Sequence, residues 1–197
     1  RSMDPVTKFK VACINGDLAT IKRIFNSVDI NYEDFNGDTG LNLACRYGDI
    51  NIAKFLIYKG ADVNYKNFNG VTALMLSCKH GYVNVVELLI FYNADLDIES
   101  RIGYNAFHYA FMYHKIKIVN IFLSLDYDYM NFYKNVTIDQ FQHIDTVRIR
   151  SYTSKFDEYK TTDEYRKNRE RFLSYKSSQI FIYTVLISDG FLTIRNV

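Results

Sequence analysis

The segment NGDTGLNLAC at residues 36–45 recurs as NGVTALMLSC at 69–78 and as IGYNAFHYAF at 102–111. The glycine near the start of each copy therefore recurs every 33 residues. A fixed period of this length is typical of repeat proteins, in which each unit buries its apolar face against neighbouring units. The period predicts a linear stack of similar units that share one elongated interior.

Each copy continues into an apolar segment with the spacing of an amphipathic helix. These segments read IAKFLI at 52–57, VVELLI at 85–90 and IVNIFL at 118–123. Apolar residues at positions i, i+3 and i+4 lie on one face of a helix. The second half of each copy is therefore expected to be a helix that packs on the next copy.

With this period and these residues, the chain resembles the ankyrin family, whose repeat is a β-turn followed by two helices. The resemblance covers about residues 4–133, since ACINGD at 12–17 parallels ACRYGD at 44–49. It implies an all-α ankyrin-repeat solenoid of about four repeats, of which the first is a cap. The expected repeats are about 4–33, 34–66, 67–99 and 100–133.

Two departures from the family pattern affect this prediction. The family's Thr-Pro-Leu-His motif lacks its proline, since residues 39–42 read TGLN and residues 72–75 read TALM. Proline at the first helical position is favourable but not obligatory, so the fold is expected to survive. The fourth repeat is degenerate, because His114 stands where the earlier repeats have glycine.

The period ends near residue 130, and the rest of the chain requires a separate assignment. Residues 161–164 read TTDE, a capping-box pattern that predicts a helix to about residue 175. A second helix is expected at 177–186, although 181–187 is also rich in the aromatic and branched residues of a strand. We expect 134–197 to form a helical C-terminal cap or extension that closes the stack, with 134–160 unassigned.

Composition restricts the function classes. The net charge is +2 and charged residues make up 23%, so the whole chain has no polyelectrolyte character. The longest strongly apolar run, 180–187, is far shorter than the ~20 residues of a membrane helix. With no secretory leader visible, we expect a cytosolic monomer, or one in the host cytosol if the source is a virus or an intracellular pathogen.

No catalytic, cofactor or metal site is expected. Cys13, Cys45 and Cys78 fall at the same point of successive repeats, which favours a column of small buried side chains over a metal site. There is no CxxC pair, phosphate loop or nucleophile elbow in the sequence. His108 matches the family's turn-stabilising histidine, so we predict a structural hydrogen bond for it and no enzymatic activity for the chain.

The resemblance also implies where a protein partner would bind, namely at the turn tips and the exposed side of the first helices. The composition of those positions, rich in Phe, Tyr, Arg and Met, is typical of interface anchors. The alternative for the tip aromatics is packing on adjacent tips. The predicted partner-binding residues of this interaction module or adaptor are Phe35, Asp38, Arg46, Tyr47, Phe68, Val71, Lys79, His80, Arg101, Tyr104, Met112 and Tyr113.

Two further hypotheses come from single features. Residues 148–176 carry nine Lys or Arg against five Asp or Glu, which would suit nucleic-acid binding, although a solvated helix face is favoured. Asn64, in the segment DVN at 62–64, resembles the asparagine that asparaginyl hydroxylases modify in ankyrin proteins. Measuring the intact mass after treatment with such an enzyme would test this hypothesis, which predicts a gain in mass.

Overall fold

The computed structural model describes residues 3–125 and residue 163 of the 197-residue chain. The chain divides into two compact units, 1–119 and 120–197, and the description below concerns the first. In chain order the helices are α1 (Pro5–Asn15), α2 (Leu18–Ile24), the 3-10 helix η1 (Phe25–Ser27), α3 (Gly40–Tyr47), α4 (Ile50–Tyr58), α5 (Ala73–His80), α6 (Val83–Phe91), α7 (Ala106–Met112) and α8 (Ile116–Ser124).

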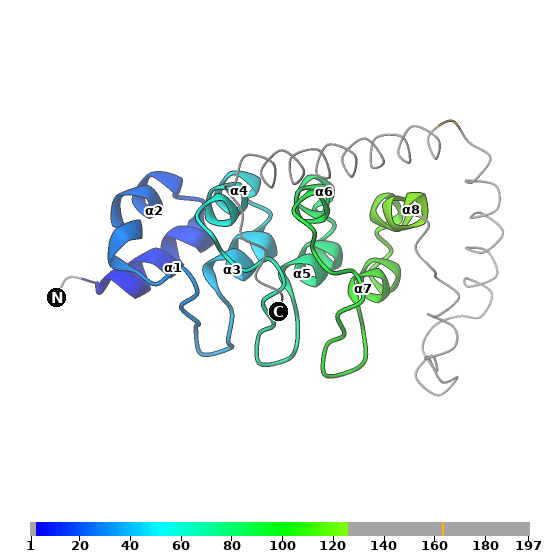
Figure 1. The fold of residues 1–197 in the computed structure, drawn as a ribbon, viewed down its shortest axis with the longest axis horizontal. Coiled ribbons are helices and arrows are strands. Elements are labelled where there is room, and N and C mark those ends of the chain that lie inside the picture. Colours follow the sequence, from blue (N-terminus) through cyan, green and yellow to red (C-terminus); the bar gives the residue numbers. More distant parts are fainter. Residues whose placement is uncertain (1–2, 126–162, 164–197) are drawn as a thin grey trace, which may run out of the picture. The chain divides into compact units, whose positions relative to one another are not determined.

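The helices of this unit form two rows. Helices α1, α3, α5 and α7, here called the inner row, contact one another in sequence, and each of the first three also contacts the helix that follows it. Figure 1 shows α2, α4 and α6 as the second, outer row, with a long loop projecting before each of α3, α5 and α7. The described residues contain no strand, so the predicted all-α repeat stack is confirmed.

Each inner helix begins at a side chain that caps it. Thr39, Thr72 and Asn105 have extended backbones, and their side-chain oxygens accept hydrogen bonds from the backbone N–H three residues later. Such a cap satisfies one of the donors that a helix start leaves unpaired. The caps recur with the period of the sequence, which explains why α3, α5 and α7 form without a proline at their first position.

The inner helices also end alike, apart from the last. Gly48 and Gly81 follow α3 and α5 in the left-handed region, with φ of 78° and 87°. At the same point after α7, His114 has a φ of 55°. The degenerate repeat therefore keeps the backbone conformation of the others, even though a residue with a Cβ is disfavoured there by about 1 kcal/mol.

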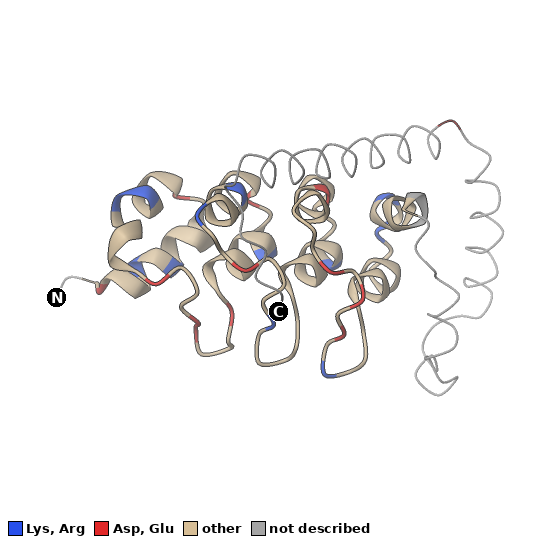
Figure 2. Cartoon of the chain, in the orientation of Figure 1, with Lys and Arg blue, Asp and Glu red and all other residues tan. Residues whose placement is uncertain are grey.

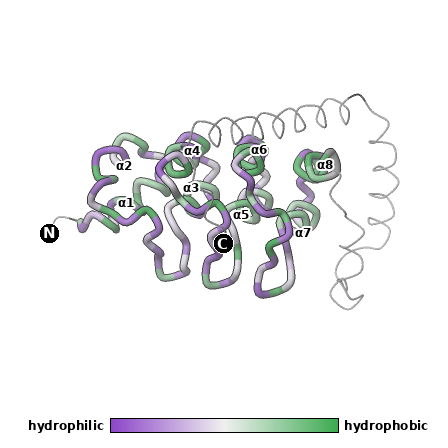
Figure 3. The backbone as a smooth tube through the Cα atoms, in the orientation of Figure 1, coloured by the Kyte–Doolittle hydropathy of each residue, from purple (hydrophilic) through white to green (hydrophobic). Residues whose placement is uncertain are grey.

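The interior consists of side chains that recur with the repeat. Leu41, Leu74 and Phe107 occupy one buried register of the inner row. Figure 3 shows the same division in hydropathy, with the helices largely apolar and the projecting loops largely polar. The predicted stack thus shares one elongated core.

The three cysteines belong to this core. Cys13, Cys45 and Cys78 are fully buried and unpaired by disulfides, one on each of α1, α3 and α5. Burial raises the pKa of the Cys45 thiol to about 12, so it is not a thiolate at neutral pH. This supports the predicted structural role.

The expectations for the carboxyl third lie outside the described residues. They concern the 133/134 boundary, the helices at 161–175 and 177–186, and the strand alternative at 181–187. Asp163 alone is described there, and it is helical.

His108 takes part in the cap at the start of α7, and its protonation should make the stability of the fold depend on pH. Its ring Nδ1 accepts a hydrogen bond from the Asn105 N–H at 3.2 Å, while the Asn105 side chain accepts from the His108 N–H at 3.1 Å. This reciprocal pair is the predicted structural hydrogen bond. Burial lowers the pKa of His108 from 6.5 to about 4.

Because the unfolded chain takes up a proton at higher pH than the folded chain, stability should fall as pH drops from about 6.5 to about 4. The loss attributable to His108 is on the order of 3 kcal/mol. Urea unfolding at several pH values would measure it, with His108→Gln as the matched variant, since Gln also supports a capping box. Equal pH slopes for both proteins would contradict the assignment.

Candidate functional site

The projecting loops form one continuous edge. Each loop closes on itself by a backbone hydrogen bond, for example from the Asn67 N–H to the Val71 carbonyl at 3.0 Å. Neighbouring loops are joined by the Phe68 N–H, which donates to the Asn36 carbonyl at 3.1 Å, and by the Arg101 N–H, which donates to the Asn69 carbonyl at 2.9 Å. The tips near residues 35, 68 and 101 therefore line a common edge.

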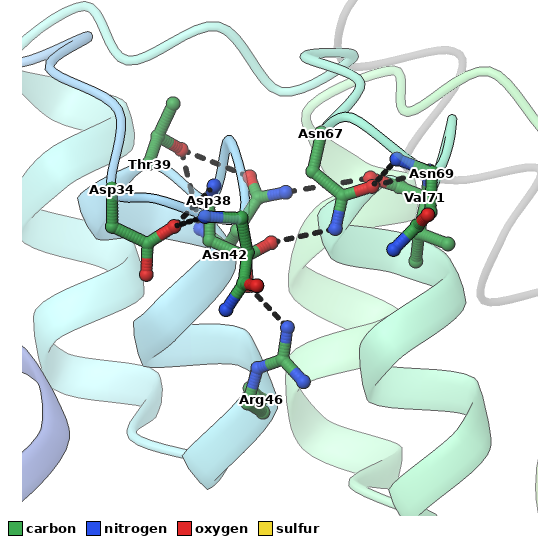
Figure 4. Close-up of polar contacts among 9 residues, drawn as sticks. Asp34, Asp38, Thr39, Asn42, Arg46, Asn67, Asn69 and Val71 are labelled. Atoms are coloured by element: carbon green, nitrogen blue, oxygen red, sulfur yellow. Dashed lines mark hydrogen bonds and ion pairs between the residues drawn. The ribbon is translucent and has the colours of Figure 1, made fainter.

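The turn at each tip is shaped by one polar side chain. Asp34 Oδ1 accepts from the backbone N–H groups of Asn36 and Asp38, at 2.8 and 2.9 Å. One period later, Asn67 Oδ1 accepts from Asn69 and Val71 in the same way (Figure 4). An aspartate and an asparagine thus build the same turn, since either supplies the accepting oxygen.

Asp38 joins two repeats from the inside. Its carboxylate accepts a hydrogen bond from Asn67 Nδ2 at 2.7 Å and forms an ion pair with Arg46, as Figure 4 shows. Only 1% of the Asp38 side chain is exposed. We predicted Asp38 as a partner contact, but its burial and its two bonds give it an anchoring role, in which it holds Arg46 on the inner helix.

The two tip aromatics differ from each other. Phe35 is 88% exposed, whereas Phe68 is 51% exposed. The Phe68 ring lies over Gly37, where a Cβ would come within 2.6 Å of Phe68 Cδ1. The alternative of packing on the adjacent tip therefore describes Phe68, while Phe35 remains open to solvent.

A pocket of about 320 Å³ lies between the second and third tips and the inner helices. Four of the predicted residues line it, namely Arg46, Val71, Lys79 and Arg101. The sequence prediction did not include most of the other residues that line the pocket. Residues 67 and 100, and residues 76 and 109, are one period apart, and this recurrence could have indicated that they lie side by side. The remaining lining residues are Asn67, Asn69, Met75, Leu76, Ser100, Ile102 and Tyr109.

Beside the pocket, three tyrosines lie before, within and directly after α7. Tyr109 stacks on Tyr113 with ring centroids 6.4 Å apart, and Tyr104 meets Tyr109 edge to face at 6.3 Å. The Lys79 ammonium lies 5.2 Å from the Tyr113 ring centroid. Met112 on the same helix is half-buried.

Positive charge gathers on this part of the surface. His80 is exposed, and its pKa is lowered by partial burial and then by Lys79, Arg46 and Lys115. Within residues 3–125, no acidic side chain lines the pocket. In contrast, the first projecting loop carries only acidic charges, as Figure 2 shows.

Comparison with known proteins identifies the repeat. A family model described as ankyrin repeats, in three copies, matches residues 9–100 and 69–133. The chain belongs to the ankyrin-repeat family. No curated protein was found to match it.

Ankyrin repeats are in general protein-interaction modules and are in general not enzymatic. Within residues 3–125, no group of three or more His, Cys, Asp or Glu side chains is arranged to hold a metal ion. The helices of that part of the chain are too short or too polar to cross a membrane. Asn64 is half-buried there, and its amide oxygen accepts a hydrogen bond from the Asp95 N–H at 2.8 Å. The hydroxylation of Asn64 stays a prediction.

Proposed function

We propose that this ankyrin-repeat chain is an interaction module or adaptor that binds a partner protein across its turn tips and the exposed side of α3, α5 and α7. The observation that carries this proposal is the exposure of large aromatic side chains at a tip and at the ends of two of these helices. Phe35 is 88%, Tyr47 50% and Tyr113 44% exposed. Large aromatic residues gain apolar contact area when a partner covers them, and they lose little rotamer freedom.

The scaffold beneath these residues is held by hydrogen bonds between repeats and by helix caps, which favours binding. The tips are joined to each other by backbone hydrogen bonds, and α3 and α5 are capped and bury all but their last two residues. A surface that is ordered before binding loses less entropy when the partner arrives. We further propose that the module is monomeric and acts in the cytosol.

The test is a pair of surface variants. Phe35→Ala/Tyr47→Ala is expected to weaken partner binding by about 10-fold or more, since two anchors are removed. The melting temperature should hardly change, because both side chains are largely exposed. Affinity capture with mass spectrometry identifies partners, and titration calorimetry then measures their affinity.

The matched control is Tyr58→Ala. Tyr58 is 79% exposed but lies at the end of α4, in the outer row. The Tyr58→Ala variant should bind partners as tightly as the unmodified chain does. Equal binding by the double variant and the unmodified chain, or a loss confined to Tyr58→Ala, would contradict the proposed surface.

A further inference from the structure

We propose that the pocket between the second and third tips binds a carboxylate side chain of the partner, next to an apolar residue of the same segment. The partner segment is then a short acidic–apolar peptide. This inference rests on the proposed function and adds the chemistry of the partner.

The charge of the pocket supports an anionic occupant. Arg46, Lys79 and Arg101 converge on it from α3, α5 and the third tip. Among the described residues, neither Lys79 nor Arg101 forms an ion pair, and no lining residue is acidic. A carboxylate from a partner would supply the missing counter-charge, and complementary charge of this kind favours both association rate and specificity.

Arg46 is held in place for such a contact. Asp38 binds it from the buried side, and the Arg46 side chain remains 33% exposed. A guanidinium has five N–H donors, so the bond to Asp38 leaves others for a second acceptor. Since Asp38 is itself fixed by Asn67, the arginine is ordered before any partner arrives.

The rest of the lining favours a peptide over a nucleic acid. Val71 is half-buried and Ile102 is 60% exposed, so both offer apolar surface, while Met75 and Leu76 are buried beneath them. Bases of a nucleic acid stack best on exposed aromatic rings, and the exposed apolar lining here is aliphatic, whereas a peptide can place a Leu, Ile or Phe beside its Glu or Asp. The volume of about 320 Å³ lies at the lower end of binding pockets, which suits one or two side chains.

The test uses random dodecapeptides displayed on phage and selected against the full chain. Sequences enriched on the unmodified protein are expected to place Asp or Glu next to an apolar residue. Selection against Lys79→Glu/Arg101→Glu should lose that acidic enrichment. A pool without acidic enrichment, or one unchanged by the charge reversal, would overturn the inference.

An enriched peptide then gives a quantitative test by fluorescence anisotropy. Lys79→Glu/Arg101→Glu should weaken its binding at least about 10-fold, as should replacing its acidic residue with the matching amide. The matched control, Lys22→Glu/Lys54→Glu, changes the net charge equally but alters exposed lysines of α2 and α4, and should bind normally. Circular dichroism would check that both variants fold.

Two outcomes separate this inference from the proposed function. Binding that depends on Phe35 and Tyr47 but ignores Lys79 and Arg101 would overturn the pocket assignment and leave the proposed surface standing. A random single-stranded oligonucleotide is the counter-probe. If the oligonucleotide bound through Lys79 and Arg101 while no peptide was enriched, the pocket would be a phosphate-binding site and the inference would be wrong.

Discussion

Gly37→Ala is expected to lower the free energy of unfolding by about 3 kcal/mol, whereas Gly103→Ala should lower it by only about 1 kcal/mol. Both glycines occupy the same turn position, with φ of +76° and +75°. The strain of placing a Cβ at positive φ is therefore common to both. At Gly37 the new Cβ would also lie 2.7 Å from the backbone N of Phe68, whereas at Gly103 no described atom lies within 4 Å.

The difference between the two variants isolates the contact between neighbouring tips. Gly70→Ala should fall between them, because the nearest backbone atom there, the Arg101 N, lies 3.0 Å from the added Cβ. Urea unfolding followed by circular dichroism gives all three values. Equal losses at the three positions would mean that the tips do not pack on each other.

Asp38→Ala is expected to lower the free energy of unfolding by about 2–4 kcal/mol. The substitution removes the acceptor of Asn67 Nδ2 and the ion-pair partner of Arg46, and it leaves a buried amide unsatisfied. The Arg46 side chain is one-third exposed, so water compensates part of its loss. The effect should therefore fall below that of a fully buried pair. Chemical denaturation at neutral pH measures it.

Asp62→Ala serves as the matched control for Asp38→Ala. Asp62 is exposed and accepts only a local hydrogen bond, from the Asn64 N–H at 2.8 Å. Its removal should lower the free energy of unfolding by less than about 1 kcal/mol.

Asp38→Asn should have an intermediate effect, since it can keep the bond to Asn67 but not the charge that pairs with Arg46. Similar losses at Asp38 and Asp62 would contradict the anchoring role.

The repeat fold was predictable because its determinants are local and periodic. The caps at Thr39, Thr72 and Asn105, the core leucines and the cysteine column each recur in the sequence itself. The burial of Asp38 was not predictable, for the opposite reason. An aspartate in a turn is usually solvated, and its burial here depends on Asn67 of the next repeat and on Arg46 of the following helix.

The candidate site was only partly predictable for a related physical reason. A surface position can be derived from the repeat register, so Phe35, Tyr47, Arg46 and Lys79 could be named from the sequence, and their contact with a partner stays a prediction. A pocket instead depends on which side chains of adjacent repeats leave space between them. Met75, Leu76 and Tyr109 look like ordinary apolar helix residues in the sequence, and only their packing shows that they line a cavity.

The most direct test of the proposed binding surface is amide chemical-shift mapping by NMR, with the isotope-labelled full chain and an enriched dodecapeptide or captured partner segment. We predict that the perturbed amides will fall within residues 35–47, 68–80 and 101–113. Perturbations confined to α2, α4 and α6 would show that the partner binds the outer row of helices, and would contradict the proposal.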